Sequence, residues 1–319
     1  MAGPERQLEE HQQGYSRLRT DAALWALVLI WAANFSVVKA SLEDFHPLAF
    51  NTTRFLLASV LLVVIVWAMG GSLRFARRDW WSLIWLGVLG NTAYQVMFIF
   101  GIDWTLAGNA ALMLATVPIF ATLLSVVLGH ERVGAGVWVG AALSFVGIGL
   151  VVWGGAKTVS FGAGTVRGDL TMLAAAVAWS VYTVGSSPLL RKYGTLPVTA
   201  MTMWIGAAGL AAVSVPALTT QAWADVRPWS WIGLLYSGIM AIAVAYLLWY
   251  YSVRHLGSSR TAVYSNTIPL VALLIAWVTL GETPGWLQIL GAAAILGGIF
   301  LARRSRPIGT PRSESPPPE

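Results

Sequence analysis

The fold is decided by two stretches, LATVPIFATLLSVVLGHERVGAGVWVGAALSFVGIGL at 114–150 and SNTIPLVALLIAWVTLGETPGWLQILGAAAILGGIFL at 265–301. They align without a gap at a constant offset of 151 residues. The residues that then coincide are Thr116 and Thr267, Pro118 and Pro269, Glu131 and Glu282, Gly134 and Gly285, Gly140 and Gly291, Ala141 and Ala292, Ala142 and Ala293, and Gly147 and Gly298. Proline, glutamate and several glycines rarely coincide in one register by chance, so the stretches indicate a duplicated unit.

The duplicated unit extends towards the N-terminus of each half. A weaker match aligns Asp21 with Asp169 and Trp31 with Trp179. Each half then holds five apolar helices, and because five is odd, the second half must start on the opposite side of a membrane. Inverted repeats of this kind are a known basis for alternating access, with a substrate site near the midplane.

Composition requires lipid as the solvent. The chain of 319 residues is 57% hydrophobic and only 11% charged, whereas a soluble domain is about 25% charged. A helix needs about 20 residues to cross the hydrocarbon core. Helix-stop and helix-start residues predict ten spans at 21–41, 47–69, 80–102, 108–129, 134–154, 168–190, 197–217, 230–253, 258–280 and 285–302.

The basic residues set the orientation of these spans. With the N-terminus in the cytoplasm, fifteen lysines and arginines fall on the cytoplasmic side, four on the other side, and one, Arg54, within a span. This bias predicts both termini inside and explains the net charge of +6 without a nucleic-acid partner. No cleavable signal peptide is expected. The predicted division is a cytoplasmic tail at 1–20, five-helix repeats at 21–154 and 168–302, and a disordered cytoplasmic tail at 303–319.

The chain resembles the EamA-like members of the drug/metabolite transporter superfamily over residues 20–304. The matching motifs are Trp31, Asn34, Phe35 and Lys39 in the first helix, Arg54-Phe55 in the second, the AVAYLLWYYSVRHLG run of the eighth, and the doubled Pro…Glu pattern. Ala32 stands where the family often has glycine. The resemblance implies secondary transport, commonly export, of small metabolites through a cavity lined by helices 1, 3, 4, 6, 8 and 9, with 5 and 10 to one side.

Ionisable residues at membrane depth are the first functional candidates. All fourteen acidic residues are predicted at helix ends, loops or tails, which favours facilitated transport over proton coupling, with Asp21 or Asp169 at a cavity mouth as the exception. Arg54 either anchors a substrate carboxylate or phosphate, or extends to the interface or to a neighbouring carboxylate. Lys39 is expected at the interface.

Two symmetric pairs have competing structural and functional interpretations. Glu131 and Glu282 either bond to loop amides or act as gates, and Pro118 and Pro269 bend their helices either as hinges or as fixed kinks. Neutral polar and aromatic residues at depth either bond between helices or line the substrate cavity. With Arg54, the cavity candidates are Asn34, Asn51, Tyr94, Gln95, Asn109, Met113, Thr116, Trp179, Tyr182, Tyr246, Trp249, Tyr264 and Asn266.

Several function classes are disfavoured. The chain has no cysteine, no histidine within a span and no phosphate-binding loop, so we expect neither an enzyme nor a metal or other cofactor. A carrier that exports an amino acid or related compound across a bacterial inner membrane is the leading interpretation. The alternatives are a sugar-phosphate or nucleotide-sugar exchanger, and a channel or scaffold. Small residues in helices 5 and 10 predict close packing, within one chain or in a homodimer.

Overall fold

The apolar stretches form helices in a computed structural model, which describes residues 4–129, 133–158, 163–256 and 264–304. In the first half these are α1 (Pro4–Ser41), α2 (Pro47–Ala68), η1 (Arg77–Asp79), α3 (Trp80–Gly87), η2 (Val88–Ala93), α4 (Tyr94–Trp104), α5 (Ala107–Leu114), α6 (Val117–Val127) and α7 (Ala135–Thr158). In the second they are α8 (Ala163–Tyr193), α9 (Thr195–Thr220), η3 (Trp223–Asp225), α10 (Pro228–Leu235), η4 (Tyr236–Val244), α11 (Ala245–Leu256), α13 (Ile268–Leu280) and α14 (Trp286–Arg304).

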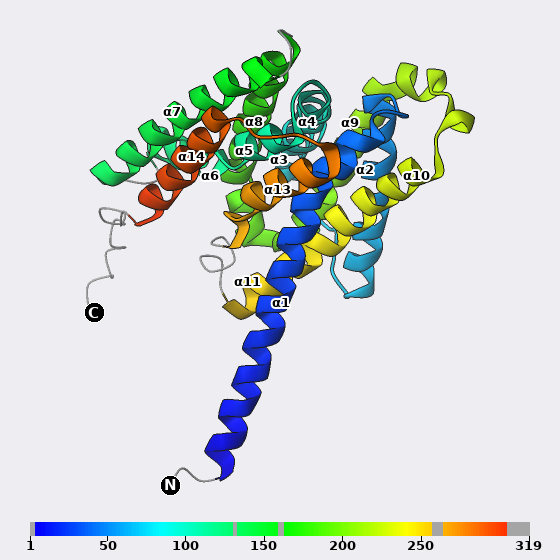
Figure 1. Cartoon of the computed structure of the whole chain (residues 1–319). Helices are drawn as coiled ribbons and strands as arrows, with labels where there is room; N and C mark the ends of the chain where they lie inside the picture. The colour runs from blue at the N-terminus through cyan, green and yellow to red at the C-terminus, as the bar shows by residue number, and fades with distance from the viewer. Residues whose placement is uncertain (1–3, 130–132, 159–162, 257–263, 305–319) are drawn as a thin grey trace.

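The described residues contain nine helices that are long and apolar enough to cross a membrane, together with the shorter apolar helix Ile268–Leu280. These ten segments confirm the predicted all-helical membrane fold. Two predicted helix starts are wrong, because α1 begins at Pro4 and α8 at Ala163. Asp21 and Asp169 therefore lie inside their helices rather than at their N-caps. The polar residues before Asp21 continue the helix, and α1 extends well beyond the bundle (Figure 1).

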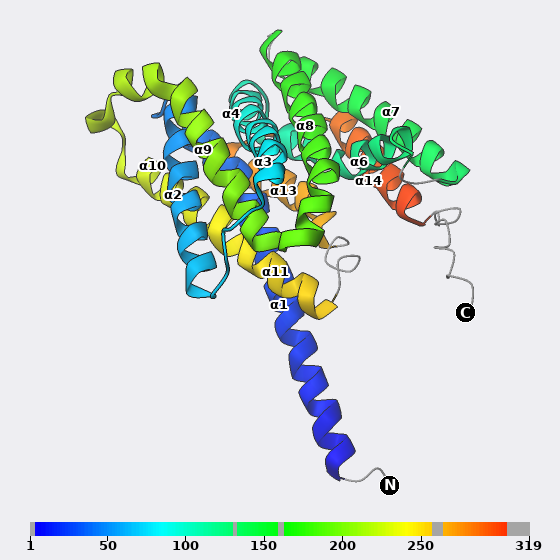
Figure 2. The same cartoon turned by 180° about the vertical axis from the view of Figure 1, so that it is seen from behind.

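The two halves pack through exchanged contacts. The first helix of the first half, α1, packs against α11 and α13 of the second half, and α8 packs correspondingly against α4, α5 and α6. Seen from behind, α8 lies beside α3 and α4 (Figure 2). Each half thus completes the other, which places their junction in the middle of the bundle.

The predicted bends at Pro118 and Pro269 are full helix breaks. Thr116 precedes α6 and its Oγ1 donates to Met113 O at 2.5 Å, while Thr267 precedes α13 and donates to Tyr264 O at 2.6 Å. Both prolines stand in the first turn of the new helix, where the missing N–H is tolerated. The same chemistry at equivalent positions supports the duplication.

Two π-helical segments occur at corresponding places in the third and eighth spans. They are η2 and η4, and the 151-residue offset places Val88–Ala93 on Ile239–Val244, inside η4. A π turn holds one more residue than an α turn and often occurs at functional sites. Each segment changes which face of its span points into the bundle.

The helices α7 and α14 form a separate pair at one side of the bundle (Figure 1). Their glycines face each other, so that a Cβ on Gly147 would lie 2.7 Å from Gly291 O and a Cβ on Gly291 would lie 2.7 Å from Gly147 O. Ser144 Oγ donates to Ile295 O at 3.1 Å. The predicted close packing of small residues is therefore made within the chain.

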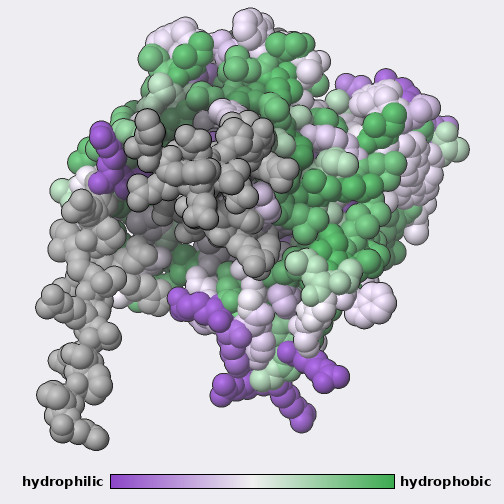
Figure 3. Space-filling view, turned by 90° about the horizontal axis from the view of Figure 1, so that it is seen from below, coloured by the Kyte–Doolittle hydropathy of each residue, from purple (hydrophilic) through white to green (hydrophobic). Residues whose placement is uncertain are grey.

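The outer surface suits lipid. Large apolar side chains such as Trp67, Val127, Val146 and Val278 are exposed. In the view from below, hydrophobic residues cover wide areas and strongly hydrophilic residues gather in a few patches (Figure 3). The exposed apolar side chains fit an outer surface that contacts hydrocarbon.

Candidate functional site

A cavity of about 540 Å³ lies where the two halves meet. Its walls come from the first, second, third, fourth, sixth, eighth and ninth spans, and Arg303 adds a contribution from the end of α14. All six spans implied by the family resemblance, 1, 3, 4, 6, 8 and 9, line the cavity, and Arg54 and Phe55 of α2 line it as well. Both proline breaks, at Pro118 and Pro269, line the cavity.

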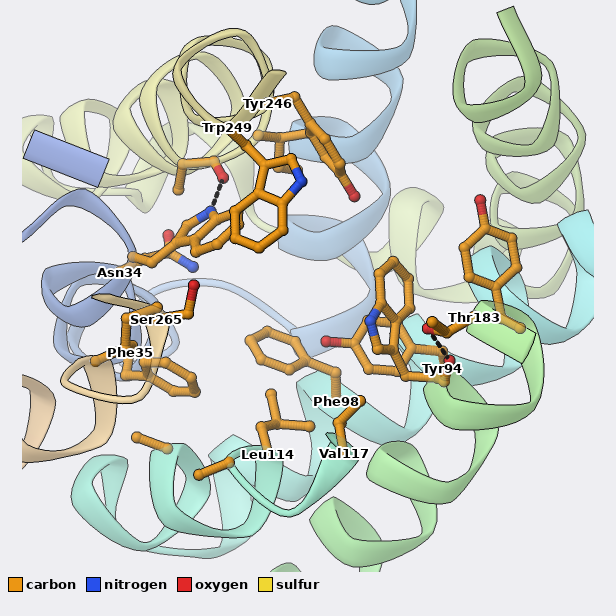
Figure 4. A pocket seen from close by; sticks show the side chains of 18 of the residues that line it. Asn34, Phe35, Tyr94, Phe98, Leu114, Val117, Thr183, Tyr246, Trp249 and Ser265 are labelled. Carbon is orange, nitrogen blue, oxygen red and sulfur yellow. Dashed lines mark hydrogen bonds between the residues drawn. The ribbon is translucent and has the colours of Figure 1, made fainter. Parts of the chain in front are cut away.

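Aromatic side chains form two opposed walls (Figure 4). On one wall Trp31 and Trp249 have ring centroids 5.7 Å apart. On the other, Trp179 lies 4.8 Å from Tyr94 and 4.9 Å from Tyr182. Trp31 and Trp179 are equivalent in the repeat, and each wall combines side chains from both halves. The walls offer apolar faces to the hydrocarbon part of a solute.

Arg54 is the buried charge at this site. It is only 2% exposed, and it donates to Asn51 Oδ1 at 2.9 Å, Ser237 Oγ at 2.6 Å and Gln95 Oε1 at 3.1 Å. These partners are neutral, and none of the ion pairs between described residues includes Arg54. The interpretations in which this arginine reaches the interface or pairs with a carboxylate are therefore wrong. A buried cation without a counter-charge is suited to receive an anion.

A polar chain connects Arg54 with the first helix. Ser237 Oγ, which accepts from Arg54, itself donates to Asn34 Oδ1 at 2.8 Å. Asn34, Arg54 and Gln95 all line the cavity. The polar groups are thus held on one side of a mainly aromatic space.

Nine of the fourteen predicted cavity residues line it, and five do not. Asn51 bonds to Gln95 O and to Arg54, so it supports the site from behind. Asn109 and Met113 are buried elsewhere, Thr116 caps the helix break, and Tyr264 donates to Asp21 Oδ1 at 3.0 Å. The residues that line the cavity are Asn34, Arg54, Tyr94, Gln95, Trp179, Tyr182, Tyr246, Trp249 and Asn266.

Sequence reasoning missed part of the lining. Trp31 is in the cavity wall and donates from Nε1 to Ala241 O at 2.9 Å. Its equivalence to Trp179 could have indicated this place. Phe35, Phe98 and Ser265 also line the cavity, but apolar or small side chains at depth carry no signal that separates cavity from core.

One end of the bundle is closed by contacts between loops and helix ends. Lys39 Nζ donates to Ile102 O at 3.0 Å and to Asp103 O at 2.6 Å, so it is engaged within the protein rather than free at the interface. Arg227 Nε donates to both Asp44 oxygens at 2.8 and 2.9 Å. The hydrogen bonds from Arg227 and Ser230 hold the pKa of Asp44 below its ordinary value. This clamp therefore keeps its charge into acidic solution.

The cavity instead reaches towards the opposite end. Its lining includes Leu190, three residues before α8 ends, and Arg303, one residue before α14 ends. Trp249 lies in α11, the part of the eighth span on that side. The site is thus closed off at the end where Lys39 and Arg227 lie and extends to the other.

Glu282 takes part in the closed end as a helix cap from another span. Its Oε1 accepts from Ala107 N at 2.9 Å and its Oε2 from Gly108 N at 3.2 Å, at the start of α5. This is the predicted bonding to backbone amides, favoured by the positive end of the helix dipole. The repeat-equivalent Glu131 lies outside the described residues.

We expect Glu282→Ala to lower the stability of the protein by about 1–2 kcal/mol, the usual cost of losing a helix cap. Glu282→Gln keeps one acceptor oxygen and should lose less. Thermal unfolding in detergent measures both, with Thr283→Ala, an exposed neighbour, as the control. Equal melting temperatures for Glu282→Ala and the control would show that the cap is dispensable.

The ten spans, the inverted repeat and the central cavity define a multi-pass membrane transporter. The chain belongs to the EamA-like transporter family, whose model matches residues 19–153 and 166–304. This family consists of transporters rather than enzymes. Within the described residues, no group of three or more histidine, aspartate or glutamate side chains is placed to hold a metal ion.

Similar proteins are also named as transporters. The chain is 31% identical over 288 residues to an uncharacterized transporter of Archaeoglobus fulgidus, covering 89% of this chain and 96% of that one. It is 31% identical over 306 residues to a probable terminal-alkyne amino-acid exporter of Streptantibioticus cattleyicolor, covering 94% and 99%. A solved structure at 20% identity matches with a TM-score of 0.63, covers 90% of this chain and 97% of its own, and supports the fold.

Proposed function

We propose that the protein is a secondary transporter that exports an amino acid or a related small metabolite across the inner membrane of a bacterium by alternating access. The observation that carries this proposal is Arg54, a buried and uncompensated cation in a cavity whose other walls are aromatic. An amino acid with an apolar side chain offers a carboxylate for the arginine and hydrocarbon for the rings.

The relatives give further support. One relative, similar over nearly its whole length, bears the name of a probable amino-acid exporter. With both termini in the cytoplasm, as the basic residues predict, the closed end faces outward and the cavity extends towards the cytoplasm. The structure then corresponds to an inward-facing state, which is the state that loads a solute for export.

A sugar-phosphate or nucleotide-sugar exchanger fits the site less well. A phosphate group carries up to two charges and is usually held by several cations. The described lining offers Arg54 at depth and Arg303 at the end of α14. A single deep arginine matches a carboxylate better than a phosphate.

Self-association is a further proposal. The predicted homodimer through helices 5 and 10 would have to use the outward faces of α7 and α14, because their small-residue faces already pack on each other. Exposed Trp138, Trp153, Trp286 and Phe300 are the side chains available there. The mass of the protein in detergent distinguishes one chain from two.

We expect one or more common amino acids to raise the melting temperature of the purified protein, because a bound ligand stabilises the folded state. The amino acid with the largest shift should then leave loaded proteoliposomes at a rate that saturates with its concentration. Flux that stays linear at high concentration would favour a channel. A stabilising sugar phosphate with no stabilising amino acid would favour the exchanger.

A further inference from the structure

Asp169 is a buried carboxylate that the transport cavity does not use. It lies in the second turn of α8, is 0% exposed and does not line the cavity. Thr105 Oγ1 donates to Asp169 Oδ1 at 2.5 Å, and Asn109 Nδ2 lies 3.3 Å from both carboxylate oxygens. Its hydrogen-bond partners are therefore neutral.

The hydrogen bonds around Asp169 connect the two halves. Asn109 Oδ1 accepts from Gln288 Nε2 at 2.8 Å, and Gln288 Oε1 accepts from Gly285 N at 2.7 Å. Thr105 and Asn109 belong to the first half, whereas Asp169 and Gln288 belong to the second. Opening this end of the bundle must separate these groups.

The chain approaches this site closely. A Cβ on Gly168 would lie 2.6 Å from Thr105 N, so only glycine lets the start of α8 rest on the turn between α4 and α5. Asp169 is placed by this contact against the Thr105 hydroxyl. The close approach at Gly168 is thus part of the packing that buries Asp169.

The charged groups nearby are engaged elsewhere. None of the ion pairs between described residues includes Asp169. Lys39 bonds to backbone carbonyls of α4, Glu282 caps α5, and the Arg167 guanidinium lies 3.6 Å from the Trp104 ring centroid. Asp103 at the end of α4 is a further acidic neighbour, and the Lys157 side chain at the end of α7 lies outside the described side chains.

We propose that Asp169 is a proton-binding site, neutral while this end of the bundle is closed and ionised when the end opens to water. Burying an ionised carboxylate among neutral groups costs several kcal/mol, so the closed packing favours the neutral acid. On opening, the O–H bond breaks, the proton passes to water and the carboxylate is left hydrated. The proposal rests on the alternating access proposed above and adds a proton to its outward step.

The repeat-equivalent carboxylate stands in a different environment. Asp21 lies at the opposite end of the bundle, is partly exposed and accepts from the Tyr264 hydroxyl at 3.0 Å. One equivalent carboxylate is buried and the other reaches solvent, as expected when one end is closed and the other is not. This difference makes Asp169, and not Asp21, the group that ionises when the closed end opens.

The sign of the pH effect follows from linkage. An aspartate in water has an ordinary pKa of about 3.9, so above that pH the open form is ionised, whereas burial among neutral groups favours the protonated acid in the closed form. Opening then increases as pH rises on that face, by at most about tenfold per pH unit for one proton. Acid on the same face holds the end closed.

The chain contains no cysteine, which allows a single reporter thiol. Ala110 in α5 is fully buried at the closed end and does not line the cavity. We expect Ala110→Cys to react with a membrane-impermeant methanethiosulfonate applied from that face, faster as pH rises from 5 to 8. The same measurement in the Asp169→Asn background corrects for ionisation of the thiol itself, because Asn imitates the neutral acid.

The quantity that decides the proposal is the labelling rate of Ala110→Cys divided by the labelling rate of Ala110→Cys in the Asp169→Asn background, taken at each pH. It should rise by tenfold or more between pH 5 and 8, and Asp103→Asn, the matched control at the same end, should leave this rise in place. If Asp169→Asn does not fold, Thr105→Val serves instead. It removes a donor to the ionised form and should enlarge the pH response.

Two negative results have different meanings. A ratio that does not change with pH, or a Thr105→Val response no larger than that of Ala110→Cys alone, overturns the proton site at Asp169. Absence of labelling from either face at any pH would instead contradict alternating access, and with it the proposed carrier.

Discussion

Replacing Arg54 by alanine should reduce transport of the stabilising amino acid by about 100-fold or more. Removing one partner of a buried ion pair costs about 3–5 kcal/mol, and 1.4 kcal/mol corresponds to a factor of ten. In the empty protein the same arginine has only neutral partners. Its loss removes no ion pair but leaves the buried Asn51 and Gln95 side-chain oxygens without this donor, so transport is compared per amount of folded variant.

Three variants make this prediction specific. Arg54→Met keeps a long side chain against Phe50 and Phe98, whose ring centroids lie 5.6 and 5.3 Å from the guanidinium carbon, and should be as inactive as alanine. Arg54→Lys keeps the charge without the fork and should retain partial transport. Arg78→Ala removes an exposed arginine and should transport normally. Normal efflux with an unchanged half-saturation in Arg54→Met would exclude an anion site at this position.

The second large effect is expected at the crossing of α7 and α14. A side chain on Gly298 would overlap the carbonyl oxygen of Gly140 and the hydroxyl of Ser144. We expect Gly298→Val to destabilise the protein by about 1–3 kcal/mol, the usual cost of overpacking. Thermal unfolding followed by size-exclusion chromatography measures this loss.

The adjacent glycine provides a matched control. A Cβ on Gly297 would meet nothing closer than Leu143 at 3.7 Å, and one on Gly149 in α7 would meet nothing within 4 Å. Gly297→Val should therefore unfold at nearly the original temperature. Since Gly298 does not line the cavity, any Gly298→Val protein that folds should keep its half-saturation. A stable Gly298→Val protein would mean that the two helices can separate without cost.

The fold could be predicted because its signals are strong and local. Apolar stretches of spanning length and the 151-residue register each limit the fold independently, whereas the orientation that the basic residues predict stays a prediction. Two helix starts could not be predicted in this way. Asp21 and Asp169 suggest N-caps, yet the residues before them continue both helices, which begin at Pro4 and Ala163.

The composition of the site could be predicted only in part, because a sequence does not say which face of a span points inward. The π segments in the third and eighth spans shift that face by one residue, so a uniform helical period fails there. Asn109 shows the consequence. An amide at depth does require a partner, as predicted, but here its partners are Asp169 and Gln288 rather than a solute. The burial of Asp169 likewise depends on the contact at Gly168, which a sequence does not reveal.

The π segments also record the history of the chain. An inserted residue is a rare event, and η2 and η4 carry it at equivalent places of the two halves. A single insertion before the duplication explains both more simply than two later ones. The ancestral unit would then have had five helices and the insertion already, and two copies inserted in opposite directions would have made the first version of this junction before one gene encoded both.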